Sequence, residues 1–416
     1  MNSSEAVSGK PLSGVRVVSF GAFIAGNVCD LLLAELGADV VKIEAHERPE
    51  ALRAYFSVDH PNFYEPSGAQ TTVLFAGLAR STRGICVNMK EPGGVDVLRR
   101  LAAASDVLVE NLGPGQMEAW GCSHEALQAV NPKLVNVSIS GYGRTGPISS
   151  YRAYASNISN YLGLSDLWAT DGTHFDHVAA VHAASAVVAG LATTRQRGEG
   201  VYIDIAQTEA GAGVMAPIYL DFLANGRDWA AGPNEVPGAL LSAVVACRGF
   251  DAWVAVELDD YADWNILCDT LERQDLRLDR ETPAQAGPEL RAALEQWAAR
   301  LTPFQCAVKL QRAGLAAAPV QTSEDLWRDP QLRSRNAYAE ITHPDIGRIE
   351  YPQSPASVAM KTSNVSRAAR LGEHTRAVLV EWLGLEAAEL DELASANAIW
   401  DAAGVPAQSE LDHSAP

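Results

Sequence analysis

The sequence lacks several features that would assign it to a specialised class of protein. Its six cysteines are scattered, with no pair at the short spacing that metal sites use. No stretch reaches the roughly 18 consecutive apolar residues of a membrane-spanning helix. The polar N-terminus, MNSSEAVSGK, has no apolar core of a secretion signal. We therefore expect a cytoplasmic protein with reduced thiols, no metal site and no contact with a membrane.

Basic residues are also scarce. The chain has 32 Lys and Arg against 51 Asp and Glu, which gives a net charge of −19. Such a balance argues against binding to nucleic acid or to an acidic membrane surface, and an anionic ligand would need locally clustered basic groups. With 47% hydrophobic and 20% charged residues, 416 residues in all, the chain is typical of a soluble globular protein with room for two domains.

What the sequence does contain is a regular alternation of apolar strand-like runs and amphipathic or apolar helices. Most of these runs end in a loop that contains glycine, as in SGYGRTGP after residue 139. This pattern predicts an α/β fold with a doubly wound parallel sheet, in which ligands bind beyond the carboxyl ends of the strands. The expected strands cover residues 15–20, 39–44, 85–89, 106–110, 134–139 and 201–205.

The first strand, helix and strand resemble the opening of a nucleotide-binding domain. Glu44 lies near the usual position of an acidic residue that binds ribose. The glycine fingerprint is incomplete, because Phe23 follows Gly21 where a second glycine would stand. A dinucleotide site, and with it an NAD-dependent dehydrogenase, is therefore a weak hypothesis.

The chain divides into segments of different character. Residues 45–80 read as a long irregular loop of functional type. An antiparallel pair is expected over 238–256, followed by helices, whereas 376–396 supply C-terminal helices. The predicted organisation is a disordered tail at 1–10, the first part of a large Rossmann-like domain at 11–210, a helical linker at 211–229, a small α+β domain at 230–325, a return segment at 326–402 that completes the large domain, and a second tail at 403–416.

One stretch, from His174 to Ala210, carries a candidate reactive group. Asp176 stands directly before an Ala- and Val-rich run that has no charge until Arg195. The absence of a polar face predicts a helix buried on all sides, which ends at Gly198-Glu199-Gly200. An aspartate at the head of such a helix is either an N-cap or a reactive carboxylate.

These segments together resemble the class III CoA-transferases, the CaiB/BaiF-like family of formyl-CoA transferase and carnitine CoA-transferase. The resemblance runs from about residue 12 to 385. It rests on seven segments in the family's order: VVSFGAFIAGNVCDLLLAELGADVVKIE, VNMKEPGGVDVLRRL, DVLVENLGPGQMEAWG, NPKLVNVSISGYGRTGP, the stretch described above, LAAAPVQTSEDLWRDPQL and LGEHTRAVLVEWLGL.

The resemblance implies a Rossmann-like large domain built from both chain ends, a small inserted α+β domain, and a homodimer of two interlocked rings. A hetero-oligomer is the alternative assembly. The implied activity is transfer of CoA from an acyl-CoA to a carboxylic acid, with the coenzyme A thioester as a substrate and no permanently bound cofactor. Counted back from Gly198 and Gly200, the family's nucleophile falls on Asp176, which would form a mixed anhydride and then an aspartyl-CoA thioester.

Contacts to CoA carry over to four further parts of the chain. Lys90 could serve a phosphate or be a solvated lysine, Arg152 could be a rim residue or a plain loop residue, and Tyr154 could belong to the core. The full set implied by the resemblance is Phe23, Ile24, Ala25, Val87, Asn88, Met89, Lys90, Asn111, Leu112, Gly113, Arg152 and Tyr154.

The chain departs from formyl-CoA transferase at several of its functional positions. Ala45 and Ala119 replace arginines that hold CoA there, Ile24 replaces a glutamine, and Ala155 replaces a glutamate. The glycine-rich flap is also missing, since residues 230–240 contain only two glycines. A site lined by Phe23, Ile24, Tyr154 and Phe175 favours an acyl group larger or less polar than oxalate.

Two alternatives remain at this point. An α-methylacyl-CoA racemase of the same superfamily would need a histidine base, but Tyr154 and Ala155 occupy that His-Asp loop. His174, His177 and His182 are interpreted as ordinary loop or helix-surface residues. The second alternative is a CoA-binding subunit of a hetero-oligomeric transferase, against which the retained Asp176 speaks.

Overall fold

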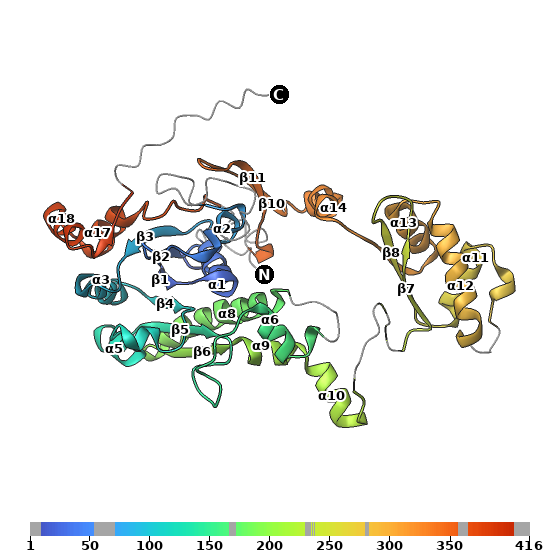
Figure 1. Cartoon of the computed structure of the whole chain (residues 1–416), viewed down its shortest axis with the longest axis horizontal. Coiled ribbons are helices and arrows are strands. Elements are labelled where there is room, and N and C mark those ends of the chain that lie inside the picture. Colours follow the sequence, from blue (N-terminus) through green and yellow to red (C-terminus); the bar gives the residue numbers. More distant parts are fainter. Residues whose placement is uncertain are drawn as a thin grey trace, which may run out of the picture. The chain divides into compact units, whose positions relative to one another are not determined.

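The computed structural model of the chain describes residues 10–53, 71–165, 172–228, 234, 236, 238–278, 283–356 and 365–402. The two expected tails lie almost wholly outside these ranges, as does much of 230–240. Contacts divide the chain into two compact units (Figure 1). The large unit comprises Met1–Leu162, Asp171–Tyr219 and Arg335–Pro416, and the small unit comprises Gly163–Thr170 and Leu220–Ser334.

The large unit is built on a seven-stranded sheet of order β12-β3-β2-β1-β4-β5-β6. Six strands are parallel, as predicted: β1 (Arg16–Phe20), β2 (Asp39–Glu44), β3 (Arg83–Val87), β4 (Val107–Glu110), β5 (Val135–Ser140) and β6 (Tyr202–Ala206). The expectation of a purely parallel sheet was wrong at one edge. There β12 (Ile399–Trp400) pairs antiparallel with β3, Ile399 opposite Val87. Two residues are too few to show a hydrophobic period in the sequence.

Helices cover both faces of this sheet. Because side chains alternate along a strand, Val17 packs under α1 (Phe23–Glu35) and α8 (His174–Arg197), and Val18 packs on the opposite face. That opposite face carries α3 (Pro92–Ala103), α5 (His124–Val130), α17 (Thr375–Leu383) and α18 (Ala387–Ser395), which places the C-terminal helices in the same core as the N-terminal strands. The result is the mixed α/β fold expected from the alternating pattern.

The helix α8 has one buried face rather than the all-round burial expected. Phe175, Asp176 and the small residues that follow at helical spacing are buried, whereas Val181 and Val188 are exposed. Small residues let α8 approach the sheet closely. By length and composition alone, α8 would be apolar enough to span a membrane, against the sequence-based expectation, but its buried face packs on β5, β6 and α1 as a core helix does.

Several short elements complete the large unit. The segment 45–80, expected to be irregular, contains η1 (Ala51–Arg53) and α2 (Val73–Leu78), and residues 54–70 lie outside the described part. Within the return segment, β10 (Tyr338–His343) and β11 (Gly347–Pro352) form an antiparallel hairpin. The remaining helices of this part are α4 (Gln116–Ala119), α6 (Ala155–Tyr161) and α9 (Gln207–Val214), and α10 (Ala216–Asn225) begins in the large unit and ends in the small one.

The small unit has a three-stranded antiparallel sheet of order β7-β8-β9. The predicted pair is present as β7 (Leu241–Ala246) and β8 (Trp253–Leu258), and β9 (Ala316–Val320) adds an edge strand that the sequence did not indicate. A separate core forms around buried Trp264 and Leu294. The helical elements are α11 (Tyr261–Thr270), η2 (Gln274–Leu276), α12 (Pro283–Ala298), α13 (Pro303–Ala313), α14 (Ser323–Arg328) and α15 (Pro330–Ser334).

Candidate functional site

A cavity of about 450 Å³ opens at the carboxyl ends of β1, β2 and β3. This volume is within the range of small-molecule binding sites, and the edge is where ligands bind in doubly wound sheets. Five of the residues predicted to contact CoA line the cavity: Val87, Asn88, Met89, Lys90 and Leu112.

One wall of the cavity comes from the far end of the chain. Because β12 pairs with β3, Asn397, Ile399 and Trp400 line the cavity beside the turn that follows β3. The Trp400 ring stacks on His46, with centroids 4.0 Å apart and planes 9° apart. An exposed imidazole and an indole therefore form a flat aromatic surface at the rim.

The turn after β3 is fixed by backbone contacts. The Asn88 N–H donates to the carbonyl of Ala398 at 2.8 Å, and the Asn88 Oδ1 accepts from the Lys90 N–H at 3.1 Å. Gly94 in α3 lies directly beneath, since a Cβ there would be 2.1 Å from the Asn88 carbonyl oxygen. The Lys90 side chain is 80% exposed and pairs with Glu47 at 3.1 Å. Lys90 is thus at the rim of the cavity, with its charge shared.

The loop after β4 is tied to the neighbouring strands. Leu112 donates its N–H to Glu110 Oε2 at 2.9 Å, and its carbonyl accepts from Arg144 at 3.2 Å. Burial raises the pKa of Glu110, and the paired Arg144 opposes this shift. The Asn111 side chain donates to the Ile139 carbonyl at 2.8 Å. Leu112 lines the cavity, while the Asn111 amide is engaged in holding β4 to the end of β5.

The loop between β1 and α1 supplied three further predicted contacts, and the structure separates them. Ala25 is buried in the core between α1 and the sheet, and Ile24 packs toward α2 and the β10–β11 hairpin. Phe23 is exposed instead, with φ of +52°, and its ring meets Tyr154 edge-on at 5.6 Å and 75°. Of these three side chains, only Phe23 is exposed at the carboxyl edge of the sheet.

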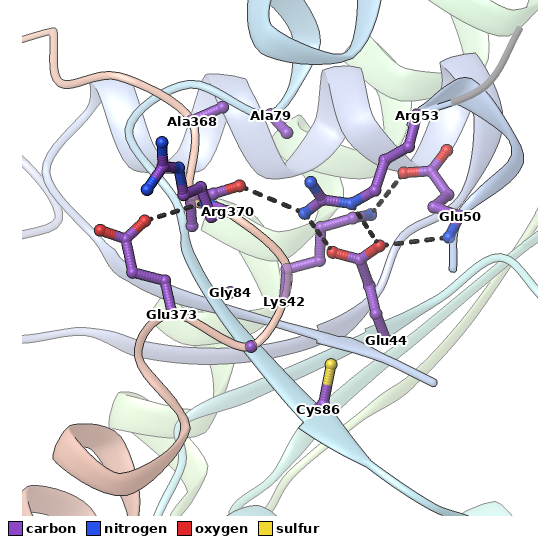
Figure 2. A network of polar contacts seen from close by, with 12 residues as sticks. Lys42, Glu44, Glu50, Arg53, Ala79, Gly84, Cys86, Ala368, Arg370 and Glu373 are labelled. Carbon is purple, nitrogen blue, oxygen red and sulfur yellow. Dashed lines mark hydrogen bonds and ion pairs between the residues drawn. The ribbon is translucent and has the colours of Figure 1, made fainter. Parts of the chain in front are cut away.

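A cluster of buried charges lies beneath this loop (Figure 2). Glu44 at the end of β2 receives both Arg53 Nε at 2.8 Å and Nη2 at 2.6 Å. Although burial raises the pKa of Glu44, the Arg53 guanidinium brings it below its usual range. A carboxylate held in this way is not available to a ribose. The structure therefore gives no support to a dinucleotide site at Glu44.

Asp176 lies in the first turn of α8, and Thr173 occupies the N-cap position without a side-chain hydrogen bond. The Asp176 side chain is 8% exposed and its Oδ1 accepts from Gln207 Nε2 at 3.3 Å. Its Oδ2 has no hydrogen-bond partner among the described residues. Burial raises the pKa of Asp176, and the hydrogen bond from Gln207 opposes that shift. The residue is thus not the N-cap of the helix, but a buried carboxylate with one oxygen free.

Asp176 and the cavity lie at the same edge of the sheet. Since α8 runs into β6, its first turn lies beside the carboxyl ends of the parallel strands, and Gln207 follows β6 directly. The helices α1 and α8 pack against each other, so the loop that carries Phe23 and the turn that carries Asp176 belong to neighbouring helices. Figure 1 shows these two helices on one face of the sheet.

Arg152, His174, His177 and His182 are exposed. The prediction that Phe175 lines the site was wrong, because Phe175 lies on the buried face of α8 and is only 3% exposed. Arg152 has no ion pair within the described ranges. His177 and His182 each place Nδ1 near a backbone carbonyl of their own helix, at 2.9 and 2.8 Å. No group of three or more metal-binding side chains is found in the described part of the chain.

Sequence reasoning missed several residues of this edge. Trp400 and Asn397 had no signal, because a two-residue strand far along the chain brings them to the cavity. Gln207 could have been found, since it directly follows a predicted parallel strand. His46 and Arg48 line the cavity too and lie within a segment expected only to be a functional loop.

Comparison with known proteins assigns the chain to a family. The family model for CoA-transferase family III matches residues 12–375. The chain belongs to CoA-transferase family III. It is thereby a CoA-transferase, and the predicted resemblance is confirmed.

The relatives of this family III chain are named after different substrates. The chain is 26% identical to the succinyl-CoA–D-citramalate CoA-transferase of Chloroflexus aurantiacus, over 90% of this chain and 95% of the relative. It is 25% identical to the human succinyl-CoA:glutarate CoA-transferase, over 94% of this chain and 90% of the relative. The chain spans about half the length of Rv1866 of Mycobacterium tuberculosis, described as a probable CoA-transferase, to which it is 28% identical over 93% of its own length.

Among solved structures, a CaiB/BaiF family protein from Brucella suis has the same fold. The TM-score is 0.78 with 24% identity, and the match covers 90% of this chain and 99% of the other. This likeness confirms the mixed α/β fold with its large, mostly parallel sheet.

Proposed function

We propose that this family III member transfers CoA from an acyl-CoA donor to a carboxylic acid, with Asp176 as the nucleophile. The observation that carries the proposal is the state of Asp176 itself. Its carboxylate is buried, is held through one oxygen by Gln207, and has its other oxygen without a partner among the described residues. Buried polar atoms are usually paired, so an unpaired one at a ligand-binding edge is a functional candidate.

The proposed reaction proceeds by two exchanges at Asp176. The carboxylate attacks the thioester carbonyl, which breaks the C–S bond and gives a mixed anhydride and CoA thiolate. The thiolate attacks the aspartyl carbonyl, releasing the first carboxylate and leaving an aspartyl-CoA thioester. The acceptor carboxylate then attacks this thioester, forming a second anhydride. The CoA thiolate released in that step attacks the acceptor's carbonyl in the second anhydride. This gives the new acyl-CoA and regenerates the Asp176 carboxylate.

The surroundings of Asp176 suit this chemistry. The first turn of a 24-residue helix presents unpaired N–H groups, which favour the carboxylate over the neutral acid. Burial opposes ionisation of Asp176, but it also removes the water shell that would make the carboxylate a weaker nucleophile. Low exposure additionally protects an anhydride and a thioester from hydrolysis. The side chain of Gln207 would keep the carboxylate in one orientation.

The CoA part of the substrate would occupy the cavity at β1, β2 and β3. Its rim carries His46, Arg48 and Lys90, the cationic or titratable groups that a phosphate-rich ligand needs in a chain of net charge −19. The turn at Asn88 and the loop at Leu112 supply backbone and apolar contacts. The acceptor-binding part would lie toward Asp176, beyond the exposed pair of Phe23 and Tyr154.

The acyl group is proposed to be larger or less polar than oxalate. Two aromatic residues, Phe23 and Tyr154, are 38% and 57% exposed at the edge where formyl-CoA transferase has polar side chains. They offer apolar contact area and no charge to pair with a second carboxylate. The relatives named above act on dicarboxylic acids by their names, so a panel of acids must include both kinds.

We further propose that the active form is a homodimer, interlocked as in the family it resembles, and that it is cytoplasmic. Support for an assembly comes from apolar side chains that are exposed to solvent in the single chain. Val181 and Val188 on α8 are half exposed, and α10 has no buried residue although it carries Phe222 and Leu223. Exposed apolar side chains on a helix are typical of an interface.

The test of the proposed function uses the purified chain alone. Succinyl-CoA and acetyl-CoA are offered with a panel of carboxylic acids, and the new acyl-CoA products are measured by mass spectrometry. We expect transfer to at least one acid, and a fall of at least about 1,000-fold in kcat for Asp176→Asn, which keeps the shape but removes the nucleophile. Hydroxylamine should trap the wild-type aspartyl thioester as a hydroxamate at Asp176.

Two other outcomes would point elsewhere. Exchange of an α-proton of the acyl-CoA with solvent, without transfer, would favour the racemase. No histidine is available for that reaction at Tyr154, and His177 is engaged with its own helix. Binding of CoA without transfer would favour a subunit of a hetero-oligomer, as in the relative named succinyl-CoA–L-malate CoA-transferase alpha subunit.

A further inference from the structure

The carboxylate of Glu50 gathers three donors from beneath the β1–α1 loop. It accepts hydrogen bonds from the backbone N–H of Phe23 at 2.8 Å and from Asn27 Nδ2 at 3.0 Å. It also pairs with Lys42 Nζ at 3.2 Å, and the two side chains are only 5% and 2% exposed. Figure 2 shows Glu50 and Lys42 together with the Glu44–Arg53 pair. A buried carboxylate with this set of donors is fixed in position, because loss of any charged partner would leave a buried charge unpaired.

Glu50 thereby caps α1 from a distant segment. The N-cap residue of α1, Ala22, has no side chain that could accept a hydrogen bond. The first N–H groups of a helix need an acceptor and favour a negative charge. Glu50, which lies 27 residues further along the chain than Phe23, supplies both.

The same contact holds Phe23 in an unfavourable backbone conformation. A φ of +52° is rare for a bulky residue and persists only where neighbouring groups enforce it. Glu50 binds the Phe23 amide, and Lys42 donates to the carbonyl of Gly21 two residues earlier. Both ends of the bend are therefore held by one buried ion pair.

The bend at Phe23 exposes the ring of that residue. The ring contacts Tyr154 at 5.6 Å, at the edge of the sheet where α1 and α8 both begin and where Asp176 lies. Glu50 also lines the cavity proposed for CoA. It stands between the coenzyme cavity and the aromatic pair without itself being exposed at the surface.

We propose that Glu50 is a positioning residue for the acyl group. Through the Phe23 amide it holds Phe23 and Tyr154 as an aromatic wall beside Asp176, and this wall selects bulky apolar acyl groups over small ones. The inference rests on the proposed transfer reaction and names the group that fixes its acyl specificity.

The test compares two acceptor acids, phenylacetate and acetate, with one acyl-CoA donor. Glu50→Gln keeps the length of the side chain and removes its charge, whereas Glu50→Asp keeps the charge and shortens the reach to Phe23. For both variants kcat/KM for phenylacetate should fall by about tenfold or more, since a small misplacement of a positioning group costs a large factor in rate. The reaction with acetate uses the same CoA cavity, which Glu50 lines, so kcat/KM for acetate should fall too, but by at least about threefold less than for phenylacetate. The phenylacetate-to-acetate ratio of kcat/KM therefore falls.

A double-mutant cycle asks whether Glu50 acts through Phe23. Phe23→Gly removes the ring and accepts a positive φ without strain. It should lower the phenylacetate-to-acetate ratio by itself, and adding Glu50→Gln should then change the ratio no further. Two independent and additive effects on the ratio would overturn the proposal.

The matched control is Glu35→Gln at the other end of α1. Glu35 forms an ion pair with Arg80 at 2.6 Å and its side chain is 1% exposed, so its loss should lower the melting temperature much as Glu50→Gln does. The acyl ratio of Glu35→Gln should stay that of the wild type. If both variants lower activity toward the two acids equally, Glu50 is only structural and the inference is wrong.

Phe23→Gly alone keeps the inference testable if neither Glu50 variant folds, since an unchanged ratio in that variant contradicts an aromatic wall. A wild-type chain that transfers CoA to no acid contradicts the proposed function, and the inference with it. An active wild type whose ratio is unmoved by these substitutions contradicts the inference alone.

Discussion

Two buried aspartates of the large unit differ in what surrounds them. Asp30 in α1 is fully buried, and its Oδ2 accepts from the Ser19 hydroxyl at 2.8 Å. Burial raises the pKa of Asp30 to about 7, although Lys42 and Ser19 both favour the ionised form. Asp176 keeps 8% exposure and lies at a helix terminus. Asp30 is thus suited to a structural position beneath the β1–α1 loop, and Asp176 to contact with a ligand.

The raised pKa of Asp30 predicts a pH-dependent stability. Between about pH 4 and 7 the unfolded chain has released the Asp30 proton while the folded chain retains it. The contribution of Asp30 to stability is therefore full below about pH 4 and is lost as the pH rises to about 7. Asp30→Asn lacks this term, so its stability relative to the wild type should increase from pH 4 to pH 7.

Urea unfolding at several pH values, followed by circular dichroism, measures this difference. Asp96→Asn, an exposed substitution on α3, serves as control and should run parallel to the wild type. A constant offset between Asp30→Asn and the wild type across this range would show that Asp30 is ionised in both states.

At the scale of elements, close approach decides how α8 and the cavity are built. Gly190 lets α8 lie against the sheet, since a Cβ there would be 2.9 Å from Val135 and 3.1 Å from Val201. Gly94 lets α3 lie under the turn at Asn88. In both places a helix meets backbone or β-branched side chains that have little freedom to move.

We predict that Gly190→Ala destabilises the protein by about 1–2 kcal/mol. Overpacking a well-packed contact typically costs about 1–3 kcal/mol, and the better helix propensity of alanine returns up to about 1 kcal/mol. Gly213→Ala in α9 is the matched control, because nothing lies within 4 Å of its Cβ position. Thermal unfolding should give a lower melting temperature for Gly190→Ala and an equal or higher one for Gly213→Ala.

A second element-scale prediction concerns CoA binding. Gly94→Ala would drive a Cβ into the Asn88 carbonyl and displace the turn that lines the cavity. Affinity for CoA should fall by at least tenfold, about 1.4 kcal/mol, when measured by calorimetric titration. Gly213→Ala should bind CoA as the wild type does. Equal affinities for all three proteins would mean that CoA does not use the turn at Asn88.

At the scale of the whole molecule, the apolar surface of α8 and α10 bears on assembly. We predict a particle of twice the 44.3 kDa chain mass in sedimentation equilibrium. If the rings are interlocked, the dimer should persist at the lowest measurable concentration, and tagged and untagged chains should exchange only after unfolding. Concentration-dependent dissociation would indicate a dimer without interlocking. A monomer at all concentrations would contradict the proposed assembly.

Much of the large unit was predictable because its elements have their own periodic patterns. Residues 15–20 and 39–44 are apolar runs bounded by turn residues, and each lies in a parallel strand within a residue or so of the prediction. The position of Asp176 followed from the long uncharged run after it. The prediction that α8 is buried on all sides was wrong. A run of Ala and Val shows that a helix has no polar face, but it does not show which of its apolar faces the rest of the chain covers.

The sequence by itself determined the order of the six parallel strands along the chain, the family, and the acidic residue at the head of α8, because these depend on neighbours along the chain. Only the tertiary structure decided what surrounds the site. Trp400 reaches the cavity through a two-residue strand, and Glu50 caps a helix that begins 27 residues earlier. Such contacts join segments whose separation leaves no local pattern, so burial and the pairing of charges select them when the chain closes into a core.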